Sequence, residues 1–167
     1  MRAGKVLAII GGVLGVLSVV LYYINTELLS FWRLDAGATL KFFLGGFGTL
    51  SGELATIPFP AEYSGDWILT IVSVLIIGGS VLTFIAGITE NKTVGILGGI
   101  IFLAGPILLL IEIITQIGIF ESMADVWLPG ENLLFGSVPG VADWGIGIGF
   151  YLAIGGGILG IIGGATV

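Results

Sequence analysis

Long apolar segments alternate with polar connections along this sequence. Four stretches, 6–24, 67–88, 94–120 and 144–167, contain only one charged side chain between them, Glu112. A helix of roughly 20 residues crosses the ~30 Å hydrocarbon layer of a bilayer, so each stretch is long enough to span it. The pattern predicts an all-α membrane protein, in which residues 1–167 form a single four-helix transmembrane bundle with loops at 25–66 and 121–143.

The overall composition also favours lipid as the surrounding medium. Hydrophobic residues make up 56% of the chain and charged residues 10%, and the mean hydropathy is +1.18. A water-soluble domain of this length needs more polar side chains to cover its surface. We therefore expect the lipid bilayer to be the main partner of this protein.

The few positive charges predict the orientation in the membrane. Arg2 and Lys5 precede the first apolar stretch, and Lys92 lies between the second and third. Because basic residues stay on the cytoplasmic side, we expect both termini to be cytoplasmic in the cell membrane, with both long loops outside. The acidic residues of those loops are Glu27, Asp35, Glu53, Glu62, Asp66, Glu121, Asp125, Glu131 and Asp143. This acidic outer face would either attract cations or a basic partner, or simply keep the loops soluble.

Glycine is unusually frequent, with 30 residues, and many recur at four-residue spacing inside the apolar stretches. In lipid, helices associate where small residues let their backbones approach. The residues expected to make such contacts are Gly11, Gly15, Gly79, Gly87, Gly95, Gly99, Gly149, Gly156, Gly160 and Gly164. The last stretch carries two small faces, which suggests that it contacts its own bundle on one side and a neighbouring subunit on the other; the alternative is a helix wrapped entirely within a monomer.

Glu112 is the one ionisable residue inside an apolar stretch, and Thr115 and Gln116 follow it one turn later. A carboxyl group facing lipid is costly, so this face should point into the bundle. Glu112, Thr115 and Gln116 are therefore a candidate intramembrane polar site. It would serve either as an ion or proton site, or as a structural hydrogen bond between helices.

The residue types exclude several other kinds of chemistry. There is no Cys and no His, which removes the common zinc, haem and copper ligand sets and most hydrolytic constellations. The Lys and Arg residues are too few and scattered for nucleic-acid binding. We expect no enzyme activity, no catalytic residue, no cofactor and no metal.

The outline of the chain resembles the claudin-like tetraspan group and small prokaryotic four-helix proteins of the same plan. The residues that carry the resemblance are the opening at 5–12, Trp32 after the first apolar stretch, and the re-entry at 92–99. The Gly-Leu-Trp element and the Cys pair of animal claudins are missing, so a paracellular barrier is not implied. What the resemblance implies is a protein that works by lateral assembly.

Three hypotheses for the function, from different classes, follow. The first is a non-enzymatic tetraspan protein that assembles with itself or with other membrane subunits, through glycine-lined helices and apolar loops. The alternative is an ion channel or transporter subunit with a path lined by Glu112, Thr115 and Gln116. An integral-membrane enzyme acting on lipids is the third and weakest hypothesis.

Overall fold

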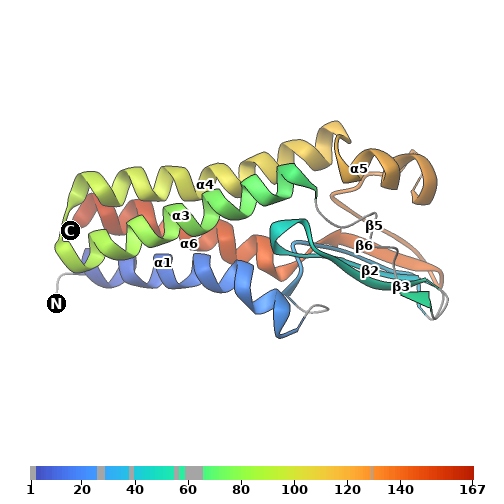
Figure 1. The fold of residues 1–167 in the computed structure, drawn as a ribbon, viewed down its shortest axis with the longest axis horizontal. Coiled ribbons are helices and arrows are strands. Elements are labelled where there is room, and N and C mark those ends of the chain that lie inside the picture. The colour runs from blue at the N-terminus through green and yellow to red at the C-terminus, as the bar shows by residue number, and fades with distance from the viewer. Residues whose placement is uncertain (1–2, 26–28, 38–39, 55–56, 59–65, 129) are drawn as a thin grey trace.

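The computed structural model describes residues 3–25, 29–37, 40–54, 57–58, 66–128 and 130–167. Four long helices lie side by side, and a β-sheet extends from one end of them (Figure 1). Both termini and the short turn between the second and third long helices lie at the opposite end. We call these two ends the sheet end and the terminal end.

The long helices are α1 (Ala3–Val20), α3 (Trp67–Thr89), α4 (Lys92–Thr115) and α6 (Ile148–Thr166). A 3₁₀ turn, Leu21–Tyr23, extends α1 toward the sheet. Each of α1 and α4 packs against both α3 and α6, which closes the bundle.

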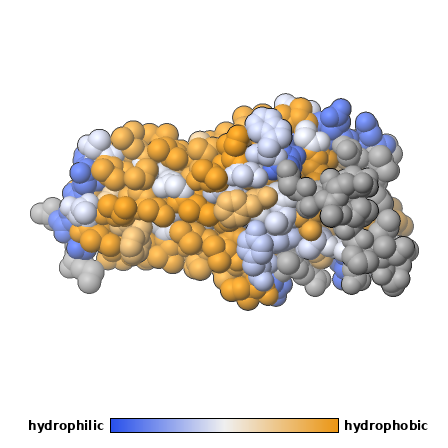
Figure 2. Space-filling view, viewed as in Figure 1, coloured by the Kyte–Doolittle hydropathy of each residue, from blue (hydrophilic) through white to orange (hydrophobic). Residues whose placement is uncertain are grey.

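All four helices are long and apolar enough to cross a membrane. Their outward faces carry large apolar side chains, including Val74 at 56% exposure and Ile114 at 60%. Figure 2 shows this hydrophobic surface along the bundle, with hydrophilic residues near the two ends of the molecule. In water such a surface would drive aggregation, whereas in lipid it is the expected exterior. The chain is therefore a multi-pass membrane protein.

The helix boundaries at the α3–α4 turn follow from local capping. Glu90 ends α3 in the left-handed conformation, with a φ of 55°. Asn91 then caps α4, because its side chain accepts a hydrogen bond of 3.1 Å from the backbone N–H of Val94. Two residues thus reverse the chain at the terminal end, where Lys5 Nζ also lies 3.6 Å from Glu90 Oε1.

Inside the bundle, glycines bring helix backbones into direct contact. A Cβ atom built on Gly11 of α1 would lie 2.6 Å from the carbonyl oxygen of Gly156 in α6. A Cβ atom on Gly95 of α4 would lie 2.5 Å from the Cα of Gly164, also in α6. Side chains at these positions would push the helices apart, so glycine sets the distance between them.

The sheet has six strands in the order β4-β3-β2-β1-β6-β5, and every neighbouring pair is antiparallel. Four strands come from the first long connection: β1 (Trp32–Asp35), β2 (Leu40–Leu44), β3 (Leu50–Leu54) and β4 (Ile57–Pro58). The second connection supplies β5 (Phe135–Val138) and β6 (Ala142–Ile146). Trp32 of β1 is aligned with Leu44 of β2 on one side and with Ile146 of β6 on the other. The two connections therefore fold as one unit.

One face of the sheet is covered by helix α5 (Ile119–Ser122) and the π-helical turn Met123–Trp127 that follows it. Trp32 is fully buried in this layer and makes edge-on ring contacts with Phe42 and Phe120, at centroid distances of 6.0 and 5.7 Å. Its indole Nε1 donates a hydrogen bond of 2.6 Å to the carbonyl of Leu133. Trp32 is therefore the centre of a side-chain core of the kind found in water-soluble proteins.

The sheet is tied to the bundle at its membrane-proximal edge. The Tyr22 hydroxyl donates to the carbonyl of Phe43 at 3.0 Å and lies 2.7 Å from the Ser51 hydroxyl. The Ser73 hydroxyl of α3 accepts a hydrogen bond of 2.8 Å from the backbone N–H of Phe47. These contacts hold the first connection against α1 and α3.

The prediction of an all-α fold was wrong, because both segments predicted as loops contain strands and the fold is mixed α/β. The fourth helix also begins at Ile148 instead of residue 144, since 142–146 pairs with β1 as strand β6. The apolar residues of β6 resemble a continuation of the helix in the sequence, although they belong to the sheet. The third predicted span, 94–120, includes the end of α4 at Thr115 and the start of α5 at Ile119.

Candidate functional site

The candidate polar site is divided by the structure. Glu112 lies one turn before the sheet end of α4 and has no exposed surface. Thr115 and Gln116 are exposed, and the Thr115 hydroxyl donates to the carbonyl of Ile111 within its own helix at 2.7 Å. Gln116 ends α4 in the left-handed conformation, with a φ of 52°. The three side chains therefore do not line a common path.

The polar neighbour of Glu112 is instead Asp66, the residue that caps α3. Asp66 Oδ1 accepts a hydrogen bond of 2.8 Å from the backbone N–H of Ile68, and its Oδ2 accepts one of 2.9 Å from that of Ile119. The two carboxyl groups meet at Gly118, where a Cβ atom would lie 2.6 Å from Asp66 Oδ2 and 2.7 Å from Glu112 Oε1. Gly118 has a φ of 62°, so glycine is favoured here by both conformation and space.

This arrangement joins three helices at the sheet end of the bundle. Neither oxygen of Glu112 receives a hydrogen bond from a donor in the described part of the chain. A hydrogen bond between Glu112 and Asp66 requires a proton on one of the two carboxyl groups, since two carboxylates offer only acceptors. With one proton present, the pair connects α4 to the start of α3 and, through Asp66, to the start of α5.

Glu112 has no water-sized space beside it, as its zero exposure indicates. Among the described residues, no group of three potential metal ligands comes together either. The geometry of Glu112 and Asp66 is thus suited to holding helices together. Glu112 can be recognised in the sequence because it interrupts an apolar stretch. Asp66 gives a weaker signal, because an acidic residue directly before an apolar stretch is common at the end of a loop.

The glycines expected to pack helices face other parts of the same chain. Gly156 and Gly160 of α6 lie against Phe102 and Thr83 on neighbouring helices, and Gly149 lies against Leu29. The other members of the set also have close neighbours in other helices: Gly11, Gly15, Gly79, Gly87, Gly95, Gly99 and Gly164. Both small faces of α6 are therefore occupied within the monomer.

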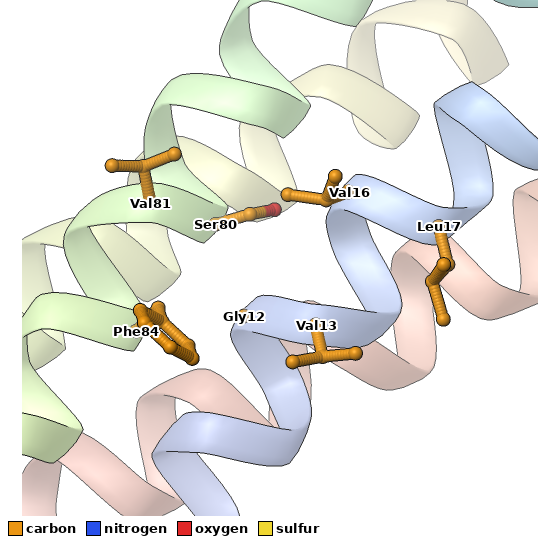
Figure 3. Close-up of a pocket in the computed structure, with 7 residues that line it drawn as sticks. All are labelled: Gly12, Val13, Val16, Leu17, Ser80, Val81 and Phe84. Atoms are coloured by element: carbon orange, nitrogen blue, oxygen red, sulfur yellow. The ribbon is translucent and has the colours of Figure 1, made fainter.

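A shallow groove runs between α1 and α3 on the lipid-facing side of the bundle (Figure 3). It is lined by Gly12, Val13, Val16, Leu17, Ser80, Val81 and Phe84. The Ser80 hydroxyl already donates to the carbonyl of Ile76 within α3. The groove therefore presents hydrocarbon, and an acyl chain of the bilayer is a suitable occupant.

A second exposed apolar surface, apart from the groove, is the edge strand β5 of the sheet. Strand β5 ends the sheet and pairs with β6, so half of its backbone N–H and C=O groups point away from its neighbour. Its apolar side chains are exposed as well, with Phe135 at 69% and Val138 at 43%. Val141, in the turn that follows, is 63% exposed. Edge strands of this kind are common sites of strand pairing between chains.

Comparison with known proteins gives no further identification of these sites. No protein-family model matches the chain, and no curated protein matches it significantly.

Proposed function

We propose that this chain is a non-enzymatic tetraspan membrane protein that acts by lateral assembly with a second copy of itself. The contact would be made by the edge strand β5, outside the membrane. In this proposal the sheet end faces the cell exterior and both termini are cytoplasmic.

The observation that carries the proposal is the exposed edge of β5. Phe135 and Val138 are large apolar residues on a strand whose outer backbone groups face away from the sheet. Proteins usually protect such an edge with charged residues or proline. Within β5 the sequence is Phe-Gly-Ser-Val, which contains neither a charged residue nor a proline.

A second copy is a suitable partner because the membrane aligns the two molecules. Copies anchored in one bilayer present β5 at the same height, and a twofold axis along the membrane normal brings the exposed apolar side chains of the same strand of both copies together. The glycine faces of the helices are less suitable as an interface, since they already contact each other within the chain.

The distribution of charge supports the proposed orientation. Lys5 and Lys92 lie in short polar segments at the terminal end, whereas the basic residues of the sheet end, Arg33 and Lys41, lie in long folded connections rich in acidic residues. Basic residues are retained on the cytoplasmic side of membranes. Membership of a claudin-like group is likewise proposed, on the four-span plan and on Trp32 in the first outer connection.

The channel alternative gains no support from the geometry. A conduction path requires polar groups facing a water-filled space. Glu112 is fully buried, and Thr115 and Gln116 lie apart from it on the exposed surface.

Cysteine crosslinking in membranes tests the proposed assembly. The natural chain has no cysteine, so Ser137→Cys places a single thiol on β5. We expect mild oxidation to convert a large share of this variant to a disulfide-linked dimer. The matched control is Glu121→Cys, an exposed position on α5 at the same end of the molecule, which should stay largely monomeric. Equal crosslinking of the two variants, or none in either, would reject assembly through β5.

A further inference from the structure

A small hollow with charges of both signs lies where the sheet meets helix α6. Its lining comes from β1, β5, β6 and the first turn of α6, and includes Arg33, Phe135, Asp143, Trp144 and Tyr151. Its volume of about 190 Å³ is below the range of roughly 300 to 1,000 Å³ that is usual for drug-sized ligands. It is therefore large enough for a small polar group only.

Exposed aromatic residues place this hollow at the level of the lipid headgroups. Tyr23 at the end of α1, Trp67 at the start of α3 and Tyr151 in the first turn of α6 are 55%, 70% and 62% exposed. Tyr and Trp concentrate at membrane–water interfaces, where a ring can contact both apolar and polar groups. Since Tyr151 itself lines the hollow, the hollow opens into the headgroup layer at the sheet end.

Arg33 is available to bind an anion in this hollow. It is exposed, its cross-strand neighbours are Phe43 and Gly145, and it takes part in no ion pair among the described residues. The other basic residue of the sheet, Lys41, has a carboxylate partner: its Nζ lies 3.8 Å from Asp35 Oδ2. A guanidinium group can donate two parallel hydrogen bonds to a phosphate, which makes arginine well suited to this role.

Asp143 contributes the opposite charge to the same hollow. It is exposed, and no ion pair joins it to Arg33 in the described structure. A site with an arginine alone would favour anionic lipids, whereas the carboxylate repels a second negative charge and attracts an ammonium group. The pair of charges thus matches a headgroup that contains both a phosphate and an amine.

We infer that this hollow binds the headgroup of a zwitterionic phospholipid such as phosphatidylethanolamine, with its phosphate on Arg33 and its ammonium on Asp143. The acyl chains would follow the lipid-facing side of α6, where Tyr151, Ile158 and Ile162 share one exposed face. Gly155 lies on the same face, and no atom of another helix lies within 4 Å of its Cβ position, which leaves room for a chain.

Native mass spectrometry of the purified protein with defined lipids tests this site. We expect the protein to retain phosphatidylethanolamine more strongly than phosphatidylglycerol. Arg33→Gln should lower retention of phosphatidylethanolamine roughly tenfold, because a charge-assisted hydrogen bond is lost. Asp143→Asn should reduce the preference for phosphatidylethanolamine over phosphatidylglycerol.

Two further variants separate binding from folding and from general charge effects. Lys41→Gln removes a positive charge from the same sheet and should leave lipid retention unchanged. Arg33→Lys keeps the charge and should restore part of the binding, which gives a result even where Arg33→Gln folds poorly. Stronger retention of phosphatidylglycerol by the natural protein, full retention by Arg33→Gln, or equal loss with Lys41→Gln would each overturn the inference.

Discussion

In the helical bundle the backbones themselves touch, whereas in the sheet the close contacts are made by large side chains. Gly11 and Gly156 bring α1 and α6 together, while Trp32 contacts the ring of Phe120 in α5 and donates a hydrogen bond to the carbonyl of Leu133. The difference follows from the two surroundings. In lipid there is little hydrophobic driving force for helix association, so helices are held together by close backbone approach and dispersion contacts. In water the burial of aromatic surface stabilises the fold directly.

The greatest loss of stability is expected from a substitution in the core of the sheet. Trp32→Ala should destabilise it by about 3 to 5 kcal/mol, because the substitution removes a fully buried ring and leaves a cavity. Trp67→Ala is the matched control, since Trp67 is 70% exposed and should lose little stability. Protease resistance of the sheet end, measured in detergent, distinguishes the variants. Equal resistance of the two would show that Trp32 is not the centre of the core.

A smaller loss of stability is expected in the bundle, where two adjacent glycines of α6 can be compared. A Cβ atom on Gly156 would lie 2.8 Å from Phe102 Cζ and 3.0 Å from the Gly11 carbonyl, whereas Gly155 faces open space. We expect Gly156→Leu to lower the free energy of unfolding by about 1 to 3 kcal/mol through overpacking. Gly155→Leu should change it much less. Thermal unfolding in detergent measures both, and similar losses in the two variants would contradict packing through glycine backbones.

The smallest change in the free energy of unfolding is expected at Glu112, where the bundle meets the sheet. Glu112→Gln keeps a hydrogen-bond donor next to Asp66, so its unfolding free energy should stay within about 1 kcal/mol of the natural protein. Glu112→Ala leaves the site without a donor and opens a cavity, and should cost about 1 to 3 kcal/mol. Chemical unfolding of both variants in detergent tests this structural role. A larger loss with Gln than with Ala would indicate that the ionised form of Glu112 is required instead.

The same contrast explains how much of the molecule could be predicted from its sequence. Length and apolar composition suffice to locate helices in lipid, so α3 begins at Trp67 as predicted and ends within one residue of the predicted boundary. The strands are short, and β1 pairs with partners from two distant segments, β2 and β6. Such pairing has no local signal, and apolar strand residues such as Trp144 resemble the beginning of a membrane helix.

Of the candidate site, the sequence predicts the buried acid but not the residues that surround it. A single acid in an apolar stretch identifies Glu112 as a candidate, and helical spacing predicts Thr115 and Gln116 as its partners. Its actual neighbours are Asp66 and Gly118, which depend on how α3, α4 and α5 meet in space. Helical spacing places residues on a face, but it does not show what packs against that face.

The proposed placement of the sheet end outside the cell and the terminal end in the cytoplasm can be tested by cysteine labelling in intact cells. Ser137→Cys places a thiol at the sheet end and Thr89→Cys places one at the terminal end, both at exposed positions in a chain without natural cysteines. We predict that a membrane-impermeant maleimide labels Ser137→Cys in intact cells and labels Thr89→Cys only after permeabilisation. Labelling of Thr89→Cys in intact cells, or of Ser137→Cys only after permeabilisation, would contradict the proposed orientation.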